Sequence, residues 1–143
     1  MLEIKNISVD FDRPILKNIS LKAKRGQIIG LVGKSGAGKS TLLNVISGHL
    51  PPKNGMLYLN GEALPNASTL LIPGFQEVKL VSQDYNLDPY HTVEENIREA
   101  AISLTEKHKV RRVEQLIKLL KLDTIRNVKA SETSGGEQQR LSI

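Results

Sequence analysis

The chain has no cysteine and no tryptophan, and it holds only two phenylalanines and three tyrosines among its 143 residues. The lack of cysteine excludes disulfide bonds and thiolate metal sites. So few aromatic side chains argue against a stacking platform for single-stranded nucleic acid. The net charge of +5 favours anionic partners such as nucleotides, nucleic acid or lipid headgroups. Because the basic residues are scattered along the sequence, we interpret them as a solvated surface and expect no nucleic-acid partner.

Long apolar runs are also missing. No segment approaches the ~20 apolar residues needed to span a bilayer, and the N-terminal residues 1–5 lack the apolar core of a signal peptide. We therefore expect a soluble, cytoplasmic chain. Its length suits one domain, and a hydrophobic content of 39% is enough to bury a core.

A glycine-rich stretch at residues 30–41 fits the phosphate-loop pattern Gly-x-x-x-x-Gly-Lys-Ser/Thr. The apolar run 27–32 predicts a strand that enters the loop, and residues 39–47 predict a helix that leaves it. A glycine-rich turn that happens to precede a helix is the simpler alternative. The four fixed positions and the two flanks together favour nucleotide binding. The candidate phosphate-binding residues are Gly33, Lys34, Ser35, Gly36, Ala37, Gly38, Lys39, Ser40 and Thr41.

These residue types suit the binding of an anion. Glycines at 33, 36 and 38 permit positive φ, so that consecutive backbone N–H groups can converge on a phosphate. The N-terminus of the following helix adds a partial positive charge. Lys39 can then reach the terminal phosphates, and the hydroxyl of Ser40 can ligate Mg²⁺.

Residues 2–24 read as an antiparallel pair of strands around a turn at 12–14, and residues 56–59 predict another strand, followed by the tight-turn signal Asn60-Gly61. Phe11 lies near the end of the first strand. It can fill the core or stack on a purine, and the sequence leaves the two interpretations equal. Residues 64–77 predict a loop.

The run 78–82 predicts a further strand that ends in Gln83. Ligands of open α/β sheets bind at the carboxyl ends of the strands. Gln83 could therefore reach the metal or the attacking water at the phosphate loop, although an ordinary strand-end glutamine has the same appearance.

Two capping boxes predict helix starts in the second half of the chain. Thr92 and Glu95 begin a helix that runs to about residue 102, and a second helix follows over about 105–122, with Val110, Val113, Ile117 and Leu120 on one face. The second box is formed by Ser134 and Glu137.

The second box encloses Gly135 and Gly136, which are poor helix formers. They suit a site where a ligand approaches the backbone closely, and so the stretch predicts a second phosphate-facing surface. A loose loop before a helix is the alternative.

With residues 33–41, Gln83 and the stretch 134–138 in this order, the whole chain from residue 1 to residue 143 resembles the nucleotide-binding domain of ATP-binding cassette (ABC) transporters. The resemblance implies an α/β fold of the P-loop NTPase type. Residues 1–83 would form an N-terminal antiparallel β subdomain and the P-loop core. Residues 84–137 would form a helical subdomain, and 138–143 would start an unfinished helix.

The resemblance also implies roles for individual residues. Phe11 would stack on adenine, and residues 33–41 would bind the phosphates of ATP, with Lys39 on the β and γ groups. Ser40 and Gln83 would contact Mg²⁺. The signature-like residues Ser134, Gly135, Gly136 and Glu137 would bind the γ-phosphate held by a second domain in a head-to-tail dimer.

A transmembrane transporter subunit would dock near Asp84 to Tyr90, which would hold the chain at the inner face of the membrane. Two signature positions depart from the family pattern, since Thr133 replaces a leucine and Glu137 a glutamine.

The family's next elements are a Mg²⁺-supporting Asp, a general-base Glu and a switch His, and the sequence ends at Ile143 before them. We therefore expect a truncated ATP-binding subunit that binds ATP and Mg²⁺ but hydrolyses ATP poorly. The C-terminal part of the core would be missing, which would expose sheet edges and favour self-association. A soluble ABC-type ATPase acting on ribosomes or nucleic acid, and a short nucleotide-dependent binding module, are the alternatives.

Overall fold

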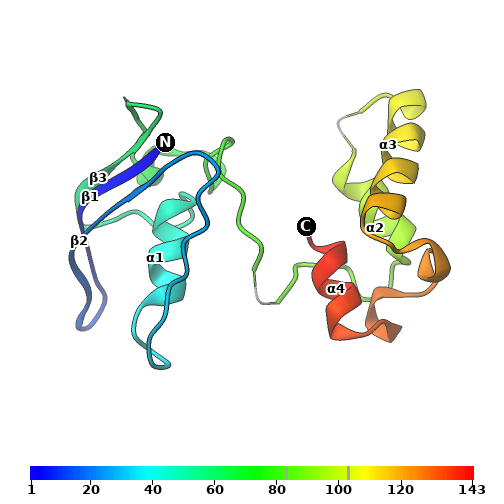
Figure 1. The fold of residues 1–143 in the computed structure, drawn as a ribbon, viewed down its shortest axis with the longest axis horizontal. Coiled ribbons are helices and arrows are strands. Elements are labelled where there is room, and N and C mark those ends of the chain that lie inside the picture. The colour runs from blue at the N-terminus through cyan, green and yellow to red at the C-terminus, as the bar shows by residue number, and fades with distance from the viewer. Residues whose placement is uncertain (83, 103) are drawn as a thin grey trace. The chain divides into compact units, whose positions relative to one another are not determined.

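The computed structural model describes residues 1–82, 84–102 and 104–143. Within them the chain divides into two compact units, Met1–Leu80 and Val81–Ile143 (Figure 1). None of the helices in these described ranges is both long enough and apolar enough to cross a membrane.

The first unit is built on an antiparallel sheet in the order β2-β1-β3-β4. Its strands are β1 (Leu2–Asp10), β2 (Pro14–Ala23), β3 (Asn54–Leu59) and β4 (Glu62–Ala63). β1 pairs with both β2 and β3, which confirms the predicted strand pair and the strand at 56–59. The Asn60-Gly61 turn joins β3 to β4 with both residues at positive φ, as the sequence signal predicts.

One helix, α1 (Lys39–Ile46), packs against a face of this sheet (Figure 1). The buried cluster takes residues from the strands, from α1 and from the loop that follows β4. Its members are Ile4, Ile7, Val9, Leu16, Leu42, Val45, Leu57 and Phe75. Gly48 follows α1 at a φ of +79°, the left-handed conformation expected of a helix stop. The segment 64–77 is a loop with one short 3₁₀ turn, Ala67–Thr69, as predicted.

Two predicted strands are not formed. Residues 27–32 and 78–82 have no strand assignment, and Ile28 and Val32 in the first run are each 96% exposed. A strand is held by hydrogen bonds to a neighbour, and neither run pairs with another strand among the residues described. An apolar run is thus not sufficient for a strand without a paired neighbour.

The second unit is helical. Its helices are α2 (Val93–Ala100), α3 (Glu106–Leu119) and α4 (Gly135–Leu141), with 3₁₀ turns at Asp123–Ile125 and Ala130–Glu132. The buried cluster is formed by Val93, Ile97, Val113, Ile117, Leu122, Ala130 and Leu141. On α3 the predicted face is correct for Val113 and Ile117 but wrong for Val110, which is 49% exposed because it lies at the outer edge of the apolar stripe.

An ion-pair network ties the second unit together at its surface. The guanidinium of Arg126 donates two hydrogen bonds to Glu94 on α2, at 2.9 and 2.6 Å, and one to Glu114 on α3, at 2.8 Å. These charged neighbours raise the pKa of Arg126. One side chain from the segment after α3 therefore connects both longer helices.

Candidate functional site

The phosphate loop forms a compact turn that leads directly into α1. The N–H of Ala37 donates to the carbonyl of Lys34 at 3.2 Å, and the N–H of Leu42 donates to that of Gly38 at 2.9 Å. Gly38 is the N-cap of α1 with φ +88° and ψ 10°, and Gly36 has a φ of +77°. Residues 33–37 are exposed to solvent. The loop therefore has the left-handed glycines and the open position that an anion cradle requires.

Strand β2 lies directly beneath this loop. A Cβ atom built on Gly38 would lie 2.9 Å from Cδ2 of Leu16 and 3.2 Å from Cγ2 of Ile15. Leu16 is itself buried in the core of the first unit. The start of β2 thus supports the loop from below, a contact that the local pattern of the sequence does not indicate.

Lys39 closes the loop with its side chain. Its ammonium group donates to the carbonyl of Gly33 at 2.8 Å and to the carbonyl of Lys34 at 2.9 Å. An ammonium group has three N–H donors, so one donor is left for a ligand. The loop therefore holds the ammonium group of Lys39 against its own backbone.

Ser40 lies in the first turn of α1 and is exposed, and Thr41 follows it half-buried. Among the described residues there is no group of three or more His, Asp or Glu side chains able to hold a metal ion. A Mg²⁺ ion at the Ser40 hydroxyl would therefore need most of its oxygen ligands from a bound nucleotide and from water, which is how Mg²⁺ is usually bound.

Phe11 lies in the turn between β1 and β2, where its N–H donates to the carbonyl of Arg13 at 3.1 Å. Its side chain is 61% exposed and is not part of the buried cluster. The core-filling interpretation is therefore wrong, and stacking on a purine stays a prediction. Gln83, the other predicted contact of the metal, lies outside the described residues.

The signature-like stretch begins α4 with a reciprocal capping box, as predicted. The backbone N–H and the hydroxyl of Ser134 donate to one carboxylate oxygen of Glu137, at 2.8 and 2.7 Å. These bonds lower the pKa of the Glu137 carboxyl. A Cβ atom on Gly135 would meet nothing within 4 Å, so the backbone of this turn is open to approach.

Two side chains anchor the same turn within the second unit. The amide of Gln138 donates to the carbonyl of Ala130 at 2.9 Å. The guanidinium of Arg140 donates to the carbonyl of Leu120 at 3.0 Å, past the end of α3. Gln138 belongs to the stretch 134–138 that carries the resemblance, but its bond to Ala130 was not predicted, and Arg140 was not singled out from the sequence.

The segment 84–90 is held by side-chain hydrogen bonds, one within the segment and one from Asn96 on α2. Asp88 accepts the N–H of Tyr90 at 2.8 Å, and the side-chain amide of Asn96 donates to the carbonyl of Asp88 at 3.1 Å. Tyr90 is 78% exposed. The segment thus presents an aromatic side chain on a braced loop, which suits contact with a partner.

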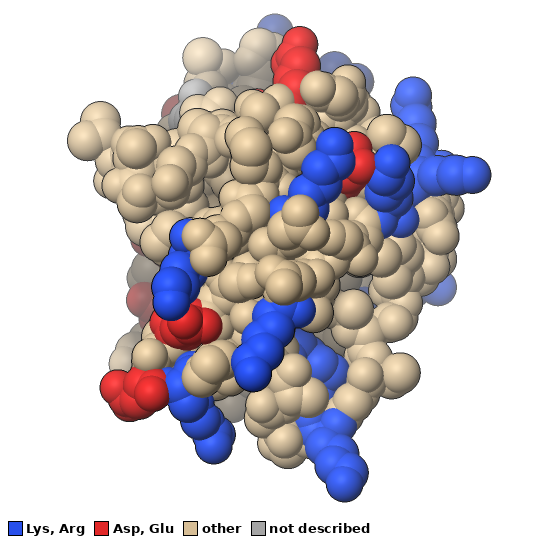
Figure 2. Space-filling model, turned by 90° about the vertical axis from the view of Figure 1, so that its left-hand side faces the viewer, with Lys and Arg blue, Asp and Glu red and all other residues tan. Residues whose placement is uncertain are grey.

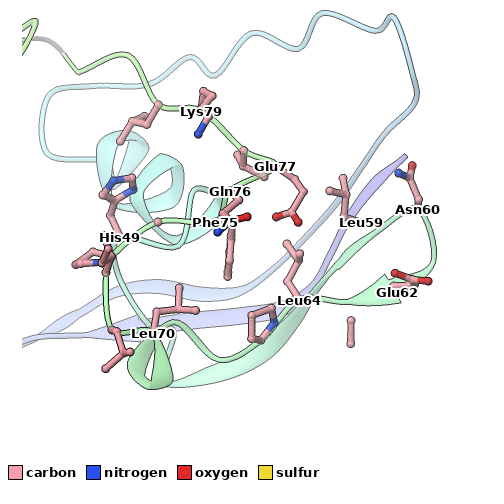
Figure 3. A pocket seen from close by; sticks show the side chains of 18 residues that line it. His49, Leu59, Asn60, Glu62, Leu64, Leu70, Phe75, Gln76, Glu77 and Lys79 are labelled. Atoms are coloured by element: carbon pink, nitrogen blue, oxygen red, sulfur yellow. The ribbon is translucent and has the colours of Figure 1, made fainter. Parts of the chain in front are cut away.

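A broad, open pocket of the first unit lies elsewhere. It is lined by the β3–β4 hairpin and by residues 70–80, with His49, Phe75 and Glu77 among its walls (Figure 3). None of the residues 33–41 lines it. The candidate phosphate site and this pocket are therefore formed by different residues.

A family model described as "ABC transporter" matches residues 16–143, which is most of the chain. The chain belongs to the ABC transporter family. This chain, called the cassette from here on, is 37% identical, over 99% of its length, to the spermidine/putrescine import ATP-binding protein PotA of Fusobacterium nucleatum. It is also 37% identical, over its full length, to the methionine import ATP-binding protein MetN 1 of Bacillus cereus.

The cassette spans about two fifths of the length of these curated relatives, 38% of the first and 44% of the second. Among solved structures it is similar to a dimeric bacterial ABC transporter cassette, with a TM-score of 0.80 and 28% identity over 100% of this chain and 67% of that one. The antiparallel sheet and the helices are thus those of a P-loop NTPase fold of the ABC type, which confirms the predicted fold class.

Proposed function

We propose that this cassette is the ATP-binding part of an ABC import subunit and that it binds MgATP at residues 33–41. The observation that carries the proposal is the geometry of Lys39, whose ammonium is held by two loop carbonyls with one donor left, above a left-handed glycine at the start of α1. In this assignment Lys39 donates to the β- and γ-phosphates, and Ser40 and Gln83 contact Mg²⁺. Phe11 stacks on adenine, which its exposure permits.

The proposed site is completed by a second copy. Residues 134–137 of one cassette face the γ-phosphate held by the loop of the other in a head-to-tail dimer. The open backbone at Gly135 supports this role, and so does the dimeric state of the similar bacterial cassette. We assign residues 1–83 to the β subdomain and P-loop core, and 84–137 to a helical subdomain.

The names of the relatives support a place at a membrane, since both are import ATP-binding proteins. The exposed Tyr90 and the braced loop around it suit the docking of a transmembrane subunit at Asp84 to Tyr90. The cassette would then be a cytoplasmic protein held peripherally at the inner face of the membrane.

We expect the 143-residue chain to bind ATP without efficient hydrolysis. Within the described ranges, no hydrogen bond or ion pair joins a carboxylate to residues 33–41. A general base must come within hydrogen-bond reach of the attacking water. In this proposal the loop binds phosphate, and the carboxylate of Glu137 in the signature turn is engaged by Ser134, so that neither is assigned as the base.

Titration calorimetry with ATP and MgCl₂ tests the proposal. We expect ATP to bind in the presence of Mg²⁺, AMP to bind far more weakly, and Lys39→Ala to lower the affinity for ATP at least tenfold, since a charge-assisted hydrogen bond contributes about 1.5–3 kcal/mol. Lys79→Ala, a change outside the loop, is the matched control. Equal affinity of the Lys39→Ala variant and the original chain would contradict the proposed site. Steady-state phosphate release at the rate of a complete cassette would contradict the expected lack of hydrolysis.

A further inference from the structure

The charges of the chain are divided unequally between its two units. Residues 1–80 carry ten Lys and Arg and five Asp and Glu, which gives +5, whereas residues 81–143 carry ten of each, which gives zero. The whole net charge of the cassette therefore belongs to the unit that holds the phosphate loop.

Within that unit, one long stretch has no acidic residue at all. Between Asp12 and Glu62 the 49 residues 13–61 contain eight Lys and Arg and not one Asp or Glu. At the acid content of the chain, 15 in 143, a stretch of this length would hold about five. It covers β2, the phosphate loop, α1 and most of the β3–β4 hairpin.

The first turn of α1 shows the same exclusion of acids. Helices α2, α3 and α4 each have an acidic residue in the first turn, where it interacts favourably with the helix dipole, but α1 has none. The helix that follows the phosphate loop therefore lacks a common source of stability. An acid at this position would repel an anionic ligand at the loop.

The two acids of β1 are paired with neighbouring lysines. Glu3 is paired with Lys22 at 2.8 Å and with Lys5 at 3.6 Å, and Asp10 is paired with Lys53 at 2.5 Å. Figure 2 views the side of the molecule that carries β1, β2 and β3, and on it the basic side chains outnumber the acidic ones. This surface therefore presents a net positive charge to the solvent.

Two cations of the stretch 13–61 are close in sequence to the residues that contact Gly38. Leu16 would touch a Cβ atom on Gly38, and Arg13 and Lys17 flank Leu16 along the chain. At a rise of about 3.4 Å per residue, both backbones lie within about 10 Å of that contact. Both side chains are exposed, and no salt bridge in the described part of the molecule includes either.

We infer that Arg13 and Lys17, within the acid-free stretch 13–61, attract the anionic nucleotide to the phosphate loop and so raise its association rate without contributing to its retention. The inference rests on the proposed nucleotide site. Clefts and surfaces of one charge sign raise the association rates of oppositely charged ligands by about 10- to 1000-fold, and less as salt is added. Lysines on an edge strand such as β2 also discourage pairing with other strands. That alternative explains Lys17 but not the lack of acids over 49 residues.

Stopped-flow binding of a fluorescent ATP analogue with Mg²⁺ to the full chain tests the inference. We expect Arg13→Glu with Lys17→Glu to lower the association rate constant about tenfold at an ionic strength of about 10 mM, where charges act over about 30 Å, and less than about twofold at about 0.5 M. The dissociation rate should stay within about twofold. The milder pair Arg13→Gln with Lys17→Gln should give about half the change in the logarithm of the rate.

The matched control is Lys107→Glu with Lys118→Glu, which makes the same change in net charge on exposed positions of α3. An equal fall in the association rate with this control would overturn the inference, as would an effect confined to the dissociation rate. If the original chain binds no nucleotide, the proposed function fails and this inference with it. If the chain binds the nucleotide, but neither the Glu nor the Gln double variant at Arg13 and Lys17 changes the association rate, only this inference fails.

Discussion

Three glycines of the phosphate-loop region differ in what an alanine side chain would meet there. Gly30 has no positive φ, and a Cβ atom at this position would have no other atom within 4 Å. Gly36 also has open space but a φ of +77°, and Gly38 combines a φ of +88° with close approaches to Leu16 and Ile15. The series therefore separates the cost of the left-handed backbone from the cost of the clash with β2.

The magnitudes follow from these two causes. Gly30→Ala should leave the free energy of unfolding unchanged or raise it by up to about 1 kcal/mol, because alanine restricts the unfolded chain. Gly36→Ala should lower it by about 1–2 kcal/mol, the cost of a left-handed L-residue. Gly38→Ala has the same backbone cost and, in addition, a cost of about 1–3 kcal/mol for overpacking against Leu16. Because the side chain of Leu16 can rotate away, we expect a total of about 3 kcal/mol.

Urea unfolding combined with native-state hydrogen exchange of the β1 and β2 amides measures these differences in the first unit. We expect Gly30→Ala to be the most stable variant, Gly36→Ala to be intermediate and Gly38→Ala to be the least stable. Equal stabilities of the Gly36 and Gly38 variants would refute the close packing of β2 beneath the loop. A loss of stability in Gly30→Ala as large as that in Gly36→Ala would refute the role of positive φ.

Two further predictions concern the second unit. Arg126→Met removes the three hydrogen bonds that join α2 and α3, and we expect it to lower the midpoint of thermal unfolding, by a modest amount because solvent screens a side chain that is 34% exposed. Arg111→Met, at an exposed position without an ion pair in the described residues, should change stability by less than about 0.5 kcal/mol. The lowered pKa of Glu137 means that its bonds to Ser134 stabilise the fold above the ordinary carboxyl pKa of 4.5 and are lost as the pH falls through the lower, folded-state value. The protection factors of the α4 amides, which correct for the intrinsic pH dependence of exchange, should therefore fall on acidification, and Glu137→Gln should reduce that fall, whereas an unchanged profile in the variant would contradict it.

Local signals predicted much of the fold. The Asn60-Gly61 turn and both capping boxes form where the sequence indicates, because each depends on residues within a few positions of one another. The antiparallel pairing of β1 with β2 followed from alternation and a short turn.

Features that depend on distant residues were not predicted. The runs 27–32 and 78–82 have the composition of strands, but a strand also needs a neighbour, which periodicity does not report. At the candidate site the pattern predicts that Lys39 binds phosphate, but it does not indicate that the ammonium group is held by the carbonyls of Gly33 and Lys34. The support of Gly38 by Leu16 links positions 22 residues apart and is equally invisible to a local pattern.

The two hydrophobic clusters share no residue, and the phosphate loop and the signature turn each belong to a different one of the two units. Substitutions in separate packed clusters change stability nearly independently of each other. Mutations can therefore accumulate in the helical unit without compensating changes beneath the phosphate loop. The two parts of the proposed site can therefore be altered separately, the loop through its glycine geometry and the signature turn through its capping box.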